Sequence, residues 1–91
     1  MRTIHKINEE LVCIESDNNI VQRVWTVENE SEIDKEPQDG WFLQYYASGI
    51  VAVAGRYKDG KMDGSWVYYY GNGEIKNIFN VDLISSFHVD T

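Results

Sequence analysis

The residues able to act as nucleophiles, general bases or soft metal ligands are few. The 91-residue chain has one cysteine, Cys13, and two histidines, His5 and His88. Cys13 beside a histidine would form a nucleophile–base pair if the fold brought the two together. His88 stands two residues before Asp90, which would pair a base with a carboxylate. One cysteine and two distant histidines fall short of the four ligands of a structural zinc site. We therefore expect no catalytic residue, no metal and no cofactor.

Cys13 lies in the apolar run of residues 11–14, which predicts a small buried hydrophobe rather than a reactive thiol. As the only cysteine it forms no intramolecular disulfide, which favours a reducing compartment. We find no charged start followed by the apolar stretch of a signal peptide. There is also no run approaching the roughly 18 apolar residues of a membrane helix. We expect a cytoplasmic protein.

The chain is acidic, with a formal net charge of −7, and the charge is uneven. Residues 1–40 hold ten acids against four bases, whereas the remainder holds five against four. Phosphate backbones and anionic membrane surfaces repel such a chain, so we expect neither nucleic acid nor membrane as a partner. A basic protein would be attracted. The alternative is that the acidity only keeps a small protein in solution.

The sequence predicts β-strands separated by turns, and these strands must position any functional residue. Residues 10–15 and 20–27 are rich in β-branched and apolar side chains, and they predict a hairpin to which residues 3–7 add an edge strand. Residues 1–27 are thus interpreted as an N-terminal hairpin or cap. Residues 28–38 carry five acids and one base, which predicts an acidic loop with a short helical turn before Pro37.

Residues 39–49 recur 24 residues later as residues 63–73, with Asp-Gly, Tyr-Tyr and the final Gly in register. Self-similarity at a fixed period indicates a repeated supersecondary unit, here a β-hairpin. Asn-Gly at residues 72–73 favours a type I′ turn in the second copy. The Asp-Gly pairs at 59–60 and 63–64 predict a double-turn connection between the copies. We expect one domain, with two repeats in residues 39–80 and a strand or tail in residues 81–91.

The pattern Asp-Gly-x-Trp-x-x-Tyr-Tyr-x-Asn-Gly-x-Ile at residues 63–75 resembles the MORN-type repeat. It is most similar to the variant in bacterial YwqK-like proteins, which are grouped as the antitoxin side of proposed toxin–antitoxin pairs. The resemblance covers residues 39–80. In the first copy the tryptophan, Trp41, lies one place early, Phe42 holds its expected position, and Ser48 replaces asparagine. The resemblance implies an all-β fold, an antiparallel meander of stacked β-hairpins forming a single curved sheet, with a protein-binding or scaffolding role.

Two groups of residues are candidates for partner binding. The carboxylates of the acidic loop would attract a basic surface, and tyrosines on an exposed sheet face bring large contact area with few rotamers. Position 44 is Gln in the first copy and Tyr in the second, which suggests a solvent-facing site. The predicted partner-binding residues are Glu28, Glu30, Glu32, Asp34, Glu36, Gln44, Tyr46, Tyr68 and Tyr70. The alternative for the tyrosines is packing, with hydroxyls in water.

The preferred hypothesis is a non-enzymatic protein-binding module, an acidic antitoxin or immunity protein that neutralises a basic toxin. Acidic charge would raise the association rate. The alternative is a structural or scaffold repeat protein that self-associates as a homo-oligomer through its sheet edges. A third hypothesis is an enzyme or small-ligand binder, which would need Cys13 or a histidine in a polar cleft with carboxylates.

Overall fold

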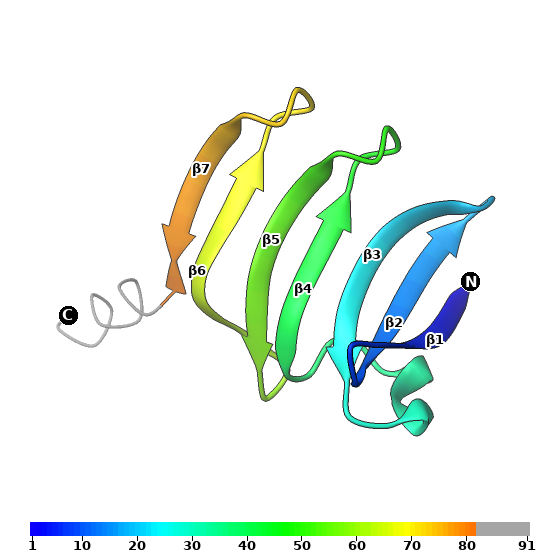
Figure 1. Cartoon of the computed structure of the whole chain (residues 1–91). Helices are drawn as coiled ribbons and strands as arrows, with labels where there is room; N and C mark the ends of the chain where they lie inside the picture. Colours follow the sequence, from blue (N-terminus) through cyan, green and yellow to red (C-terminus); the bar gives the residue numbers. More distant parts are fainter. Residues whose placement is uncertain (82–91) are drawn as a thin grey trace, which may run out of the picture.

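A computed structural model describes residues 1–81 as seven antiparallel strands and one short 3-10 helix. The elements are β1 (Arg2–Ile7), β2 (Glu10–Asp17), β3 (Ile20–Val27), η1 (Glu30–Asp34), β4 (Gly40–Tyr45), β5 (Val51–Lys58), β6 (Lys61–Tyr69) and β7 (Ile75–Asn80). The strands form one sheet in chain order (Figure 1). The strand or tail expected after residue 81 lies outside the described residues, as do His88 and Asp90.

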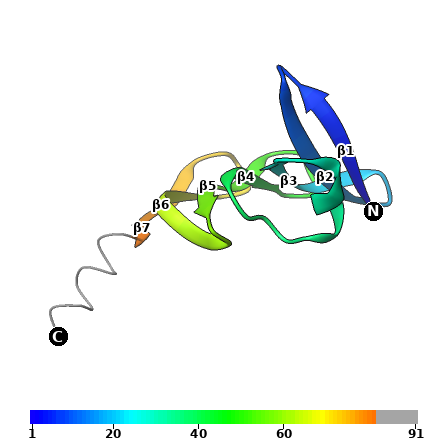
Figure 2. The same cartoon turned by 90° about the horizontal axis from the view of Figure 1, so that it is seen from below.

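The sheet is an open, curved meander, so the predicted all-β class and the stacking of hairpins are confirmed. The β1–β2 hairpin stands out from the plane of the other strands (Figure 2). The acidic segment includes the predicted short helical turn, η1, which contacts β1 and β3. None of the helical structure in residues 1–81 has the length and apolarity required to cross a membrane.

One face of the sheet, called here the core face, carries a row of buried side chains. Directly opposed residues of an antiparallel pair share a face. Across strands β1 to β5 the register aligns Ile4, Cys13, Trp25, Phe42 and Gly55. Between β6 and β7 it aligns Trp66 with Phe79. The ring centroids of Phe42 and Trp66 lie 5.7 Å apart, and those of Tyr57 and Trp66 5.1 Å apart in an edge-to-face contact. The centre of this row is therefore aromatic, with Trp25, Phe42 and Trp66 buried beside Cys13.

The turns of the two repeats share one geometry, which differs from the predicted type I′ turn. In the second copy the Gly73 N–H donates to the Tyr70 carbonyl, and the Tyr70 N–H donates to Glu74. Residues 46–50 repeat both bonds. A type I′ turn needs positive φ at both central residues, but Asn72 is not among the residues with positive φ and Gly73 is, at 90°. The type I′ prediction is wrong because the loop has three residues and places its glycine last.

The connection between the copies is a single tight turn, so the predicted double turn is wrong. Asp59 and Gly60 both have positive φ, 52° and 78°, and they join β5 to β6 in a two-residue hairpin loop. The second Asp-Gly pair, residues 63–64, lies inside β6, where Asp63 pairs with Arg56. Continued strand pairing has overridden the local turn preference of that pair.

In the core row, the indole ring of Trp66 packs directly against the backbone of Gly55. A Cβ placed on Gly55 would come within 2.2–2.5 Å of three atoms of the Trp66 indole ring. The Gly55→Ala variant is expected to lose about 1–3 kcal/mol of unfolding free energy, because the ring must move out of its packed position. Chemical denaturation followed by circular dichroism measures the loss.

Gly71 provides the matched control, because a Cβ there meets nothing within 4 Å and its φ is not in the left-handed region. Gly71→Ala is expected to change stability by no more than about 0.5 kcal/mol. Equal denaturation midpoints for the two variants would contradict the close approach of Trp66 to Gly55.

Candidate functional site

Cys13 and His5, the cysteine and the histidine of the described residues, lie on opposite faces of the sheet. Cys13 is fully buried in the core row, as predicted, and its burial raises the pKa of the thiol. His5 pairs with Val12, the neighbour of Cys13, so it lies on the opposite face of the sheet. The Cys13–His5 pair is therefore not formed. Within residues 1–81 no group of three His, Cys, Asp or Glu side chains is arranged to hold a metal.

The acidic segment is anchored by two of its own predicted binding residues. Glu32 caps η1, because its carboxylate accepts the backbone N–H groups of Glu28 and Asn29. Glu36 pairs with Arg2 and with Arg23. The remaining predicted carboxylates are exposed to solvent, namely Glu28, Glu30 and Asp34. Among the described contacts, only these three carboxylates take part in no hydrogen bond or ion pair that holds the segment in place.

Arg2, Glu15, Arg23 and Glu36 form a cluster, called here the arginine clasp. The Glu15 carboxylate lies 3.0 Å from Arg2 Nε and 2.6 Å from Arg23 Nε. Hydrogen bonds from Arg23, and then from Arg2, lower the pKa of Glu15 to about 2 against the cost of burial. Both guanidinium groups stand over the Trp25 ring, at 5.2 and 5.0 Å from its centroid. The clasp joins the acidic segment to β1, β2 and β3.

The predicted tyrosines do not form one surface with the acidic segment. Tyr46 and Tyr70 are exposed in the loops that follow β4 and β6, and the Tyr46 hydroxyl donates to the Tyr69 carbonyl at 2.6 Å. These loops lie at the upper ends of the strands in Figure 1, whereas η1 lies at the lower end. Gln44 and Tyr68 both pair with Val53 on the core face, where Gln44 is exposed and Tyr68 packs against the core.

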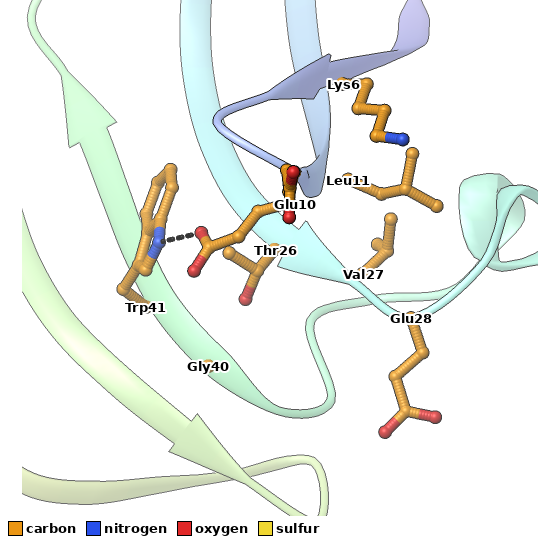
Figure 3. A pocket seen from close by; sticks show the side chains of 9 residues that line it. Lys6, Glu10, Leu11, Thr26, Val27, Glu28, Gly40 and Trp41 are labelled. Carbon is orange, nitrogen blue, oxygen red and sulfur yellow. Dashed lines mark hydrogen bonds between the residues drawn. The ribbon is translucent and has the colours of Figure 1, made fainter.

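An open groove of about 540 Å³ lies between the β1–β2 turn and strands β3 and β4 (Figure 3). Trp41 forms one side, 37% exposed, and its indole N–H donates to the Glu10 carboxylate at 3.2 Å. Lys6, Glu9 and Glu28 supply further charges to the lining. The groove thus combines an accessible indole with three carboxylates and one amine, which suits a cationic side chain.

Trp41 and Glu10 were missed as site residues, although the repeat contained a signal for one of them. Phe42 holds the core position that Trp66 holds in the second copy, and both are buried. Because side chains alternate along a strand, Trp41 must point to the other face. A tryptophan placed one residue off the core position of its repeat was therefore a detectable candidate.

The Glu10 contact had no such signal, because it crosses 31 residues of sequence. It depends on the β1–β2 turn, which brings Glu10 over β4. Comparisons of the chain with family models, with curated proteins and with solved structures found no match.

Proposed function

We propose that this chain is a non-enzymatic protein-binding module of the bacterial antitoxin or immunity type, acting in the cytoplasm on a basic partner protein. The observation that carries the proposal is the groove in which Trp41 stands beside the Glu10 carboxylate, on a chain of net charge −7. The resemblance of residues 39–80 to MORN-type repeats supports it, because those repeats build surfaces for other proteins.

The groove would receive an arginine or lysine of the partner. A cation over an accessible tryptophan contributes about 0.5–2 kcal/mol, depending on how much water is excluded. The carboxylate of Glu10 already lies beside the indole, so it can pair with the same cation without rearrangement. Tryptophan and arginine are, with tyrosine, the residues enriched at binding hot spots.

The exposed carboxylates Glu28, Glu30 and Asp34 would act at longer range. Exposed charges of this kind steer a basic surface toward its binding site and raise the association rate more than the final affinity. Because salt screens such steering, association with the partner should slow as the ionic strength rises.

Co-purification against candidate proteins, including the product of the neighbouring gene, tests the proposal. A basic protein should be retained at low salt, and Trp41→Ala should weaken its binding by about 30-fold or more, as expected for a hot-spot residue. Glu10→Gln should act in the same direction. Titration calorimetry on the retained partner measures both changes.

Tyr70→Ala is the matched control, because Tyr70 is also an exposed aromatic side chain but lies in the β6–β7 loop, outside the groove. It should leave the affinity within a few-fold of the wild-type value. Retention of no protein at low salt would count against a binding module. Loss of binding in Tyr70→Ala with none in Trp41→Ala would place the site on the tyrosine loops instead.

A further inference from the structure

We infer that the groove beside Trp41 selects arginine over lysine, and that it holds the partner by a guanidinium group that lies on the indole ring and pairs with Glu10. The inference rests on the proposed function, because it names the side chain that the same groove takes from a basic partner. Two observations support it: the pairing of Trp41 with Glu10, and a second tryptophan of this chain that already binds arginines in this way.

Trp41 and Glu10 present an aromatic ring and a carboxylate side by side (Figure 3). Trp41 is 37% exposed, and its indole N–H donates to Glu10 Oε2 at 3.2 Å. The other oxygen, Glu10 Oε1, accepts no hydrogen bond from the described residues. Within residues 1–81, cationic side chains lie over the rings of Trp25 and Tyr70 but not over that of Trp41. The ring and one carboxylate oxygen are therefore both left for a cation of the partner.

Trp25 shows how this chain binds a cation with the same two kinds of group. The guanidinium groups of Arg2 and Arg23 lie 5.2 and 5.0 Å from the centroid of the Trp25 ring. Both also donate hydrogen bonds to the Glu15 carboxylate, Arg23 through two of its nitrogens. In the arginine clasp each guanidinium thus contacts an indole ring and a carboxylate at once. The groove offers the same pair of groups at the surface.

A guanidinium group suits this pair better than an ammonium group does. It is planar, so it can lie flat on an indole while its N–H groups donate to both oxygens of a carboxylate. The ammonium group of lysine is a compact, strongly hydrated charge with no plane to stack. Leu11 and Val27 also line the groove, and they can pack against the methylene stem of either residue. These two apolar side chains therefore add affinity without selectivity, which must come from Trp41 and Glu10.

Lys6 opposes the entry of any cation, but it does not decide between arginine and lysine. Figure 3 shows Lys6 on the side of the groove away from Trp41. Its amine stands against three carboxylates in the lining, those of Glu9, Glu10 and Glu28. The balance of charge in the groove is therefore negative, and the repulsion by Lys6 acts equally on both kinds of ligand.

Titration of the isotope-labelled full chain with two matched peptides tests the inference. The probes are acetyl-Gly-Gly-Arg-Gly-Gly-amide and the same peptide with lysine in place of arginine, at low salt. The Trp41 indole N–H resonance reports binding, and it is identified by its absence from the spectrum of Trp41→Phe. The arginine peptide should bind about fivefold more tightly or better, because stacking and two-point pairing both favour it. Equal affinities, or no shift of this resonance by either peptide, would overturn the inference.

Glu10→Gln and Glu28→Gln separate the pairing beside the indole from general attraction. Each variant removes one negative charge from the lining of the groove. Glu10→Gln should bring the affinities of the two peptides within about twofold of each other, because the two-point pairing is lost. Glu28→Gln should weaken both peptides by a similar factor and keep the preference, because the Glu28 carboxylate does not bond to Trp41. Loss of the preference in Glu28→Gln but not in Glu10→Gln would contradict the assigned place of the guanidinium.

Failure of this inference and failure of the proposed function give different results. If a basic protein is retained and its binding needs Trp41, but the two peptides bind equally, the binding module stands and the arginine selectivity is wrong. If the arginine peptide is clearly preferred but no protein is retained at low salt, the selectivity of the groove stands and the proposed function is wrong.

Discussion

Replacing Trp66 by alanine is expected to lower the free energy of unfolding by about 3–5 kcal/mol. Trp66 is 2% exposed, and its ring packs against Phe42, Tyr57 and the backbone at Gly55. The strands form a single sheet, so among the described elements no second layer of strands can close over the cavity left behind. A domain of this size has a total stability of roughly 5–14 kcal/mol. Urea denaturation followed by circular dichroism should therefore show a much lower midpoint.

Trp41→Ala is the matched control, since the same side chain is removed from the opposite face of the sheet, on strand β4, which β5 separates from β6. It should cost about 1 kcal/mol or less, because the indole there is partly in solvent and holds one hydrogen bond, to Glu10. If the two substitutions destabilised the chain equally, the assignment of Phe42 and Trp66, rather than Trp41, to the core row would fail.

The fold was predictable where local pattern and tertiary packing agree. The 24-residue recurrence placed Phe42 and Trp66 at equivalent positions, and both are buried. Because side chains alternate along a strand, the position of these two residues also decides which face of β4 and β6 is buried. The apolar run around Cys13 likewise gave a buried position, because a continuous apolar strand cannot be left in water on both sides.

The fold was not predictable where pairing between strands decided the local conformation. Asp63 and Gly64 have the composition of a turn, yet β6 continues through them because β5 offers a partner on one side. The fit of the Trp66 ring over Gly55 is equally invisible in the sequence. It depends on which residue of β5 faces β6, and the register shifts there.

The candidate site was predicted least well, because its contacts join distant segments. Glu36 was grouped with the free carboxylates of an acidic loop, but it pairs with Arg2, 34 residues away. Composition gives the number of charges in a segment and not their partners. The groove was missed for the same reason: Glu10 reaches Trp41 only because the β1–β2 turn lies over β4.

Glu15→Gln is expected to lower the free energy of unfolding at neutral pH by about 2–3 kcal/mol. The Glu15 side chain is 20% exposed and accepts hydrogen bonds from Arg2 and Arg23. An amide removes the negative charge and turns an N–H group toward one of the guanidiniums. The guanidinium groups of Arg2 and Arg23 would still lie over Trp25, but Glu36 would be the one carboxylate of the clasp left to pair with them.

Glu36→Gln is the matched control, because Glu36 contacts the same two arginines but is 63% exposed. Solvent screens the charge there, so the substitution should cost less than about 1 kcal/mol. Urea titrations of the two variants beside the wild type measure the difference. A larger loss in Glu36→Gln than in Glu15→Gln would contradict the central place of Glu15 in the arginine clasp.

The contribution of Glu15 should also disappear in acid, in a defined range of pH. The pKa of Glu15 falls from 4.5 to about 2 on folding, so the unfolded chain takes up this proton first as the pH is lowered. The stabilisation is therefore fully present above pH 4.5 and is lost as the pH falls toward 2. The stability difference between wild type and Glu15→Gln should be constant above that range and shrink through it. A difference that persisted unchanged to about pH 2 would mean that the amide disrupts packing, and that the paired charge is not what stabilises the clasp.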